Sequence, residues 1–280
     1  MIVRDAVAVY PVVPFLGLRF TLAALLLLPV LRTGRSGIRA GIVPGVLLAS
    51  GYLTQTVGLE YTTASQAGIF TGLYVILTPV LEFAIFRVRP RAETGVAVAA
   101  VTVGSVLLAG GGQSSGQAQL TGDLLEIATA FLFALHIVLL GRLAPGRNAG
   151  VMALAQMAVA SVLFLGASAR QGFPPVSGEV LFAVAVTGAL ASAVAFWVQT
   201  LVQQRIAPAR TALIMVAEPA FAAFIGILLA GDTFSAAQLA GAIIILVVLA
   251  GHEALSYRSA SSAPALPDVD SPGASPPVSP

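Results

Sequence analysis

The stretch "APARTALIMVAEPAFAAFIGILLAGDTFSAAQLAGAIIILVVLAG", residues 207–251, resembles an earlier part of the same chain. Residues 64–86, "ASQAGIFTGLYVILTPVLEFAIF", and residues 91–110, "RAETGVAVAAVTVGSVLLAG", show the same order of a small-residue start, a proline and a closing apolar run. Thr78-Pro79 in the first copy aligns with Glu218-Pro219 in the second. Self-similarity of this kind predicts a chain that is built from two related units.

The composition is typical of a membrane protein, because 58% of the 280 residues are hydrophobic, 9% are charged and the mean hydropathy is +0.95. The absence of cysteine excludes disulfides, thiolate nucleophiles and cysteine-ligated metal. All 14 basic residues are arginines, so their positions say more than the net charge of +2. The sequence has no phosphate-binding Walker motif and no metal-ligand spacing, and we predict neither a cofactor nor a metal site.

Apolar runs near the length of a bilayer-spanning helix occur nine times. In hydrocarbon a helix satisfies its own backbone polar groups, and the runs lack the alternation of barrel strands. We therefore predict an all-α integral membrane protein with about nine transmembrane helices, at residues 11–31, 40–59, 64–86, 94–111, 123–143, 150–169, 180–202, 211–230 and 236–255. The Ser/Pro/Ala-rich residues 256–280 cannot bury a core, and we expect a disordered tail.

The arginines lie in alternate loops, which predicts the orientation, because positively charged loops stay on the cytoplasmic side. The intervening loops hold a single arginine, Arg170. The pattern predicts a multi-pass protein of the cell membrane with a cytoplasmic C-terminus. The arginines of the predicted cytoplasmic loops and ends are Arg32, Arg35, Arg39, Arg87, Arg89, Arg91, Arg142, Arg147, Arg205, Arg210 and Arg258.

The first residues, "MIVRDAVAVYP", look like the end of a helix whose beginning is missing, because no basic anchor or complete apolar run precedes Pro11. A tenth helix before this sequence would give two units of five helices. An odd number of helices per unit places the two copies in opposite senses across the membrane. Inverted repeats of this kind are common in secondary transporters. A chain with nine spans is the alternative.

Four segments resemble EamA-domain proteins of the drug/metabolite transporter superfamily: "FLGLRFTLAALLLLP", "GLEYTTASQAGIFTGLYVILTPVLEF", "GDLLEIATAFLFALHIVLLGRLA" and "EPAFAAFIGILLAGDTFSAAQLAGAIIILVVLAG". The resemblance covers residues 1–255. It implies a transporter of small organic metabolites or drugs, often an exporter, with two inverted five-helix EamA repeats and both termini inside. We expect the first repeat at 1–111, lacking most of its first helix, an external linker at 112–122, the second repeat at 123–255 and the tail at 256–280.

Two ionisable residues at membrane depth are the first candidates for a substrate or proton pathway, because such groups usually face a cavity. Glu218 lies eight residues beyond Arg210, and the neighbouring Pro219 can bend its helix toward a cavity. His136 has an imidazole suited to proton coupling and could form a relay with Glu218. Either residue could instead form only a structural hydrogen bond between helices.

Further candidates are Arg19, Gln55, Tyr74, Trp197 and Gln199. Gln55 and Gln199 occupy similar places in the two copies, as a site at the repeat interface requires, and a neighbouring aromatic ring can stack on a solute. The alternatives are helix–helix hydrogen bonds for the amides and interfacial anchoring for the rings. Arg19 could bind an anionic solute, but an ion pair with Glu60 or Glu126 is the interpretation we favour.

Two structural expectations concern pairs of residues. Glu82 lies close to Arg87 in sequence, so we predict an interfacial salt bridge between them. Small residues at four-residue spacing, Gly41 with Gly45 and Gly68 with Gly72, predict close helix packing.

Other functional classes fit the sequence less well. A membrane-embedded enzyme would show clustered acids, a metal pair or an activated nucleophile, and the acids here are scattered, so we predict that the chain is not an enzyme. A non-transporting scaffold or an inactive truncated transporter is the alternative function. The expected partners are a small-molecule substrate, protons and the lipid bilayer, with no nucleic acid. Whether the chain forms a homodimer stays open.

Overall fold

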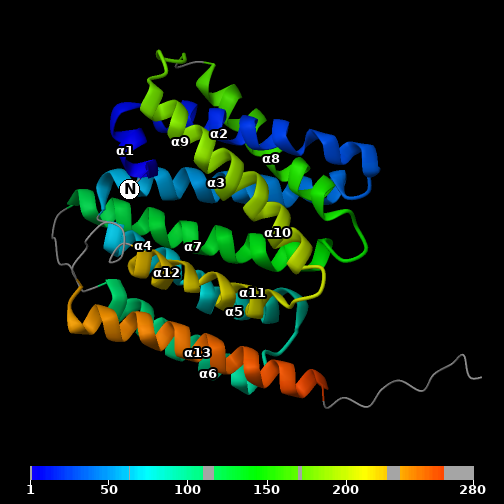
Figure 1. Cartoon of the computed structure of the whole chain (residues 1–280), viewed down its shortest axis with the longest axis vertical. Coiled ribbons are helices and arrows are strands. Elements are labelled where there is room, and N and C mark those ends of the chain that lie inside the picture. The colour runs from blue at the N-terminus through cyan, green and yellow to red at the C-terminus, as the bar shows by residue number, and fades with distance from the viewer. Residues whose placement is uncertain (1, 63, 110–116, 170–171, 226–233, 262–280) are drawn as a thin grey trace, which may run out of the picture.

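The computed structural model describes residues 2–62, 64–109, 117–169, 172–225 and 234–261, and every regular element in these ranges is a helix (Figure 1). The first half contains α1 (Ile2–Val9), α2 (Val12–Leu27) with the 3₁₀ turn η1 (Leu28–Thr33), α3 (Ile38–Tyr61), α4 (Ala64–Gly72), α5 (Tyr74–Phe86) and α6 (Ala92–Ala109). The second half contains α7 (Gln117–Leu143), α8 (Ala149–Ser168), α9 (Gly178–Gly188), the π-helical η2 (Ala189–Val194), α10 (Ala195–Val202), α11 (Pro208–Met215), α12 (Ala217–Ile225) and α13 (Ala236–Ser261).

The predicted all-α membrane fold is confirmed, because seven helical segments of the described chain are long and apolar enough to cross a bilayer. Two of the nine predicted spans differ from these seven. The apolar part of α6, Ala92–Leu108, is shorter. The span predicted at 211–230 is interrupted between α11 and α12, and its last residues lie outside the described ranges.

The predicted boundaries between units differ in detail from the helix ends. α7 begins at Gln117, inside the predicted linker, and residues 112–116 lie outside the described ranges. α13 continues to Ser261, into the predicted tail, of which residues 262–280 also lie outside them.

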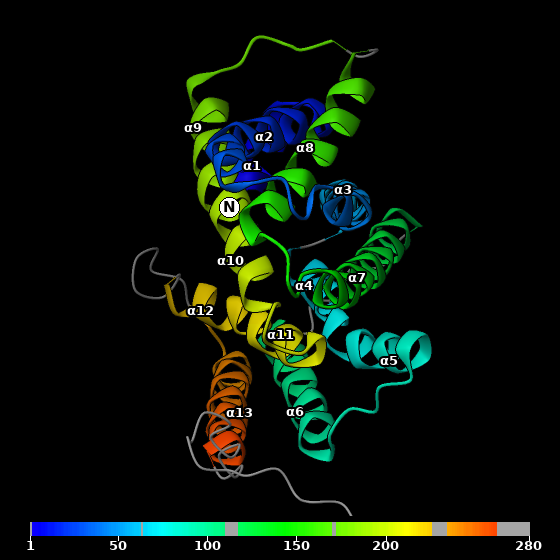
Figure 2. The ribbon, with the colours of Figure 1, turned by 90° about the vertical axis from the view of Figure 1, so that its right-hand side faces the viewer.

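The helices form a stack that is longest along one direction (Figure 2). α1, α2, α8 and α9 lie at one end, α6 and α13 lie at the other, and α3, α7, α5 and α11 lie between them (Figures 1 and 2). Each end has its own apolar core, because one buried cluster gathers around Phe20 and Phe164 and another around Val101, Leu213 and Ile245. Gln55, Tyr74 and His136 come from the elements between the two cores, whereas Arg19 comes from α2 at one end.

The helix pairing is consistent with the predicted inverted repeat. α2 packs against α8, α5 against α11 and α6 against α13, and each of these pairs would join equivalent helices of the two predicted five-helix units. Contacts between non-equivalent helices of the two predicted units correspond as well. α3 of the first unit packs on α8 of the second, and the matching contact is that of α2 with α9 and η2. The repeat itself stays a prediction.

Glycines allow the closest helix contacts. A Cβ at Gly41 would lie 2.6 Å from the Met152 carbonyl oxygen, and one at Gly45 would lie 2.9 Å from the Gln156 Cα, so both glycines of α3 pack on α8 as predicted. The prediction is wrong for Gly68 and Gly72, because a Cβ at either position would meet no atom within 4 Å.

Both members of the Pro79 and Pro219 pair lie just after a helix interruption. α4 ends at Gly72 and α5 begins at Tyr74, while α11 ends at Met215 and α12 begins at Ala217. At Pro219 the missing backbone donor is the one that would bond to the carbonyl oxygen of Met215, the last residue of α11, so this proline fits the interruption. Pro79 lies further on, inside α5, and the interruption before α5 is a tightened turn in which the Leu73 amide bonds three residues back, to Phe70.

Candidate functional site

Two adjoining cavities lie between the helices, and Gln55, Met215 and Glu218 line both of them. The first cavity, of about 530 Å³, is bounded by α2, α3, η2, α10, α11 and α12. The second cavity, of about 290 Å³, is bounded by α3, α4, α5, α6, α11 and α12. The structure thus brings Arg19, Gln55, Gln199 and Glu218 to the first cavity, and Gln55, Tyr74 and Glu218 to the second.

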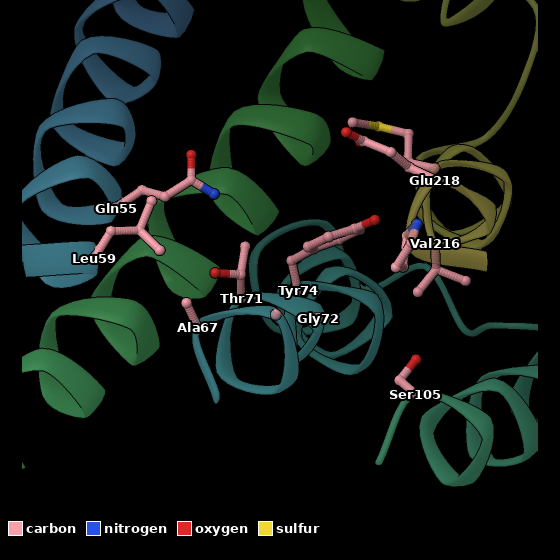
Figure 3. Close-up of a pocket in the computed structure, with 12 residues that line it drawn as sticks. Gln55, Leu59, Ala67, Thr71, Gly72, Tyr74, Ser105, Val216 and Glu218 are labelled. Carbon is pink, nitrogen blue, oxygen red and sulfur yellow. The ribbon is translucent and has the colours of Figure 1, made fainter. Parts of the chain in front are cut away.

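Glu218 lies in the first turn of α12, directly after the interruption at Val216, and its side chain is exposed to the cavities. Figure 3 shows Gln55, Tyr74 and Glu218 converging from α3, α5 and α12 on the second cavity. Glu218 forms no ion pair with a described residue. An anionic group in a cavity, free of a protein cation, can bind a cationic group or a proton.

Arg19 is fixed by neutral partners, and the predicted ion pair with Glu60 or Glu126 is wrong. Its Nε donates to the Ser192 Oγ at 2.8 Å, and its Nη2 donates to the Tyr52 hydroxyl and the Ala191 carbonyl oxygen, each at 3.3 Å. The Arg19 Cζ also lies 4.7 Å from the centroid of the Tyr52 ring, a cation–π distance. Nη1 makes no hydrogen bond with the described residues, so the guanidinium keeps donors for a solute in the first cavity.

The π-helical segment η2 shapes the wall that holds Arg19. Such segments often occur at functional sites, because their wide turn changes which carbonyl groups are free. Here the Ala191 carbonyl oxygen and the Ser192 hydroxyl both accept from Arg19. A Cβ at Gly188, directly before η2, would lie 2.9 Å from the Arg19 carbonyl oxygen, so α2 and α9 touch at this point.

The two glutamines predicted from the repeat both line the first cavity. The Gln199 Nε2 donates to the Gln203 Oε1 at 3.2 Å, and the Gln203 Nε2 donates to the Ile137 carbonyl oxygen at 2.8 Å, which fixes this part of α10 against α7. Gln55 is half-buried between the two cavities. Amides from α3 and α10 are therefore both available to orient a polar solute in the first cavity.

The other two predicted residues do not line either cavity. Trp197 is 44% exposed on the outer surface of α10, whereas the adjacent Phe196 lines the first cavity. His136 is buried, and its Nε2 is 2.8 Å from the Gln156 Oε1. Gln156 also donates to the Thr200 hydroxyl. His136 thus forms the hydrogen bond between helices that was the alternative to a proton relay. The structure does not bring His136 to Glu218.

Sequence reasoning missed Tyr52 and Phe196 as cavity residues. Tyr52 packs edge-to-face on Phe20, Phe133 and Phe196, and its ring and hydroxyl both hold Arg19. The spacing could have indicated Tyr52, because it lies three residues before Gln55 and therefore on the same side of α3. Phe196 had no such signal beyond its place next to Trp197.

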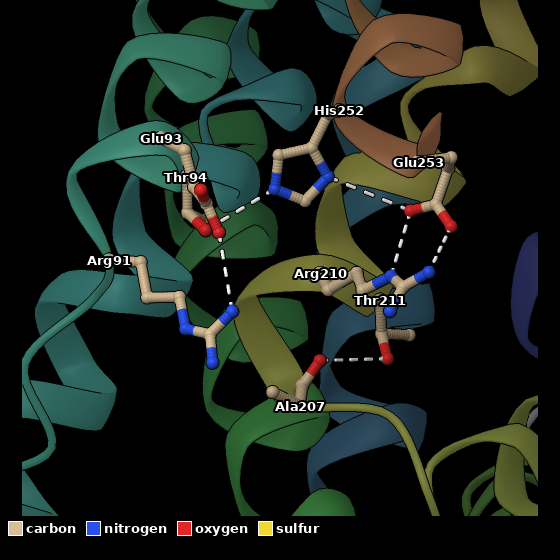
Figure 4. Close-up of polar contacts among 8 residues, drawn as sticks. All are labelled: Arg91, Glu93, Thr94, Ala207, Arg210, Thr211, His252 and Glu253. Carbon is tan, nitrogen blue, oxygen red and sulfur yellow. Dashed lines mark hydrogen bonds and ion pairs between the residues drawn. The ribbon is translucent and has the colours of Figure 1, made fainter. Parts of the chain in front are cut away.

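Another cavity, of about 570 Å³, lies at the helix ends that we predict to be cytoplasmic, between the loop after α5 and the first turns of α6 and α11. Figure 4 shows Arg210 of α11 paired with Glu253 of α13, and His252 of α13 near Thr94 of α6, with 3.3 Å between the His252 Nε2 and the Thr94 Oγ1. The cavity is lined by Arg89, Arg91, Arg205 and Arg210. These contacts join α6, α11 and α13 at one end.

The predicted salt bridge between Glu82 and Arg87 is wrong. The Glu82 Oε1 lies 3.8 Å from the Arg142 Nη2 of α7, and Glu82 is buried. Arg87 follows α5 in a left-handed conformation, with φ of 58°, and forms no ion pair with a described residue. Among the described side chains no group of three His, Cys, Asp or Glu could hold a metal ion.

Comparisons with known proteins identify a family and relatives of the chain. The model of the EamA-like transporter family matches residues 1–110 and 120–251. A curated relative from Archaeoglobus fulgidus, described as an uncharacterized transporter, is 27% identical over 237 residues, which is 82% of this chain and 73% of the relative. A solved crystal structure aligns with a TM-score of 0.77 at 17% identity, over 89% of this chain and 91% of that chain, and shows the same fold.

Proposed function

The chain belongs to the EamA-like transporter family of the drug/metabolite transporter superfamily, and we propose that it moves a small organic solute across the cell membrane by alternating access. Members of this family are transporters and not enzymes, so the site to explain is a binding site. The observation that carries the proposal is the first cavity, which is lined by Arg19 and Gln55 from one predicted unit and by Gln199 and Glu218 from the other. A site between two inverted units opens to alternate sides when the units exchange conformations.

The charges in the first cavity favour a dipolar solute. Arg19 and Glu218 line the same cavity, and neither forms an ion pair with a described residue. In a medium of low polarity a charge without a partner is costly, and a solute that carries both an anionic and a cationic group would supply a partner for each. Gln55 and Gln199 would bind its neutral polar groups.

Glu218 also suits coupling to protons. It stands in the cavity wall at a helix interruption, where a proton and a cationic solute group would compete for the same carboxylate. Competition of this kind links the movement of a proton in one direction to the movement of solute in the other. Export driven by proton entry, the direction that the family resemblance implies, is the cycle we propose.

The solute class is tested by exchange in proteoliposomes that contain the purified full chain. Radiolabelled neutral amino acids serve as dipolar probes, with their deaminated acids and decarboxylated amines as competitors that carry one charge each. We expect exchange of the dipolar probes above that of empty liposomes, and at least tenfold weaker competition by the analogues. Equal competition by either analogue would show that Arg19 and Glu218 do not act together.

The role of Glu218 is tested in the same vesicles with the variant Glu218→Gln. We expect slower transport or transport that no longer depends on pH, while the variant remains inserted and monodisperse. The matched control is Glu179→Gln, because Glu179 is exposed in the first turn of α9 and lines neither cavity. An unchanged rate with an unchanged pH profile in Glu218→Gln would remove Glu218 from the mechanism.

The alternative function, a non-transporting scaffold or inactive transporter, predicts a different outcome in this assay. Such a chain would move none of the probes, and substitutions at Arg19 or Glu218 would have no effect on any flux. No described feature favours a scaffold specifically, whereas polar residues gathered in an apolar membrane protein favour transport.

A further inference from the structure

Glu126 of α7 is a carboxyl group inside the protein that the proposed cycle does not use. It is 0% exposed. The Thr71 Oγ1 of α4 donates a hydrogen bond to the Glu126 Oε2 at 2.6 Å, while the Oε1 is buried without a hydrogen-bond partner among the described residues. A buried polar atom without a partner calls for an explanation, because leaving one unsatisfied costs free energy.

The place of the Glu126 carboxyl is built into the packing of α3 against α7. A Cβ at Gly58 of α3 would lie 2.8 Å from the Glu126 Oε1, so only a glycine lets the carboxyl lie directly on the backbone of α3. Gly58 is itself buried. The side chain of Glu126 therefore has a defined position between α3 and α4 and is not free to reach the surface.

No cation neutralises Glu126 within the part of the chain that the structure describes. The helices packed on α7 are α3, α4, α5, α8 and α11. On α3 the nearest ionisable residue along the chain is the exposed Glu60, and α4 has none. On α7 itself Asp123, one turn earlier, is also acidic and accepts from the Thr62 hydroxyl at 2.8 Å.

The remaining ionisable groups of these helices lie elsewhere or are paired. Tyr74 of α5 faces the second cavity. Other groups bind partners of their own: Glu82 with Arg142, His136 with Gln156 from α8, Arg210 of α11 with Glu253, and Tyr52 of α3 with Arg19. Arg39 and Tyr61 are exposed near the two ends of α3. α11 meets α7 far from Glu126, since Pro208 lies against Gly141.

From this geometry we propose that Glu126 is a proton-binding site that exchanges protons with the second cavity through Thr71. A proton on Oε2, the oxygen that Thr71 contacts, removes the negative charge that the apolar surroundings disfavour and leaves Oε1 as a neutral carbonyl oxygen. The Thr71 hydroxyl can follow the change, because a hydroxyl donates to a carboxylate and accepts from a carboxylic acid. Thr71 also lines the second cavity with Tyr74 and Glu218.

Glu126 lies between the predicted external end of α7 and the second cavity. Asp123 is half-exposed at the end of α7 that we predict to be external, Glu126 lies one turn deeper, and Thr71 opens on the second cavity. Protons from outside would thus pass through Glu126 before reaching Glu218. This role in coupling rests on the proposed function, whereas proton binding itself does not depend on it.

Infrared difference spectroscopy on the purified full chain in lipid nanodiscs tests the site. Spectra are recorded between alkaline and acidic buffer, in H₂O and D₂O, where the C=O stretch of a buried carboxylic acid appears as a narrow, deuterium-sensitive band. We expect Glu126→Gln to lose one such band. The control Glu60→Gln, at an exposed carboxyl, should keep it. Identical buried-acid bands in the parent and Glu126→Gln would overturn the proposal.

A second variant keeps the test independent of the stability of Glu126→Gln. Thr71→Val retains the shape of the side chain and removes the hydroxyl, so the band should remain but shift in frequency. No shift would overturn the link through Thr71. Exchange of amino acids in proteoliposomes separates the two proposals. A band lost in Glu126→Gln without any exchange would refute the proposed function alone, and exchange with an unaltered band would refute the proton site alone.

Discussion

Replacing Gly41 with alanine should open the contact between α3 and α8. The added Cβ would lie 2.6 Å from the Met152 carbonyl oxygen and 2.7 Å from the Ala155 Cβ. Backbone and Cβ atoms cannot rotate away, so the two helices must separate by some tenths of an ångström. Gly68 provides a matched control in another helix, because a Cβ there would meet nothing within 4 Å.

The size of the effect follows from two opposing terms. Alanine favours a helix over glycine by about 1 kcal/mol, and this gain is common to Gly41→Ala and Gly68→Ala. Overpacking a tight contact costs about 1–3 kcal/mol, and this cost falls on Gly41→Ala alone. The difference in stability between the two variants should therefore be about 1–3 kcal/mol, with Gly68→Ala as stable as the parent or more so.

The assay is thermal unfolding of the full chain in detergent, followed by intrinsic fluorescence at a single heating rate, because unfolding of such proteins is often irreversible. With about 2–4 °C in Tm per kcal/mol for a chain of this order of size, we expect Gly41→Ala to unfold several degrees below Gly68→Ala. Equal Tm values for the two variants would refute the close approach of α3 and α8 at this point.

Two further predictions concern orientation and His136. A reporter fused after Arg258 should be cytoplasmic, whereas one inserted between residues 111 and 122 should be external; the reverse result in an accessibility assay would overturn the orientation. His136→Leu should leave the buried Gln156 Oε1 without its partner and lower stability by about 1–3 kcal/mol, measured as Tm, without altering the pH profile of transport. A changed pH profile with unchanged stability would instead place His136 in the proton pathway.

Hydropathy predicted the helices well, because the bilayer imposes one length and one kind of secondary structure on every span. The same uniformity hides which side of a helix faces inward. Trp197 and Phe196 are neighbours in sequence, yet one lies on the outer surface and the other lines the first cavity. Adjacent residues point about 100° apart on a helix, and an apolar span carries no pattern that selects between them.

The partners of polar residues were the least predictable part. Arg19 was expected to pair with a carboxylate and instead binds two hydroxyls and a carbonyl oxygen. Its partners Ala191 and Ser192 depend on a π-helical turn that has no sequence signature. By contrast, Gln55 and Gln199, which were selected by comparing the two copies, and Glu218, which was selected as an ionisable group at membrane depth, line the same cavity.

The sequence also contained a signal for Glu126 that the sequence analysis used only in part. An acidic residue inside an apolar run is a functional candidate by default, and Glu126 was considered only as a partner for Arg19. Gly58 and Thr71, which define its surroundings, come from two other helices and have no sequence pattern that links them to it.

The π-helical turn of η2 makes the cavity wall a question of residue number. A π-helical turn holds one residue more than the α-helical turn it replaces, so the helices before and after it keep nearly the same phase. Removing a single residue between 189 and 194 would therefore let the segment relax to a regular α-helix while Phe196 and Gln199 stay on the cavity side of α10. The loss would fall on Arg19, because the Ala191 carbonyl oxygen and the Ser192 hydroxyl would no longer be placed together to accept from it. One codon thus decides whether this wall of the cavity can hold the guanidinium.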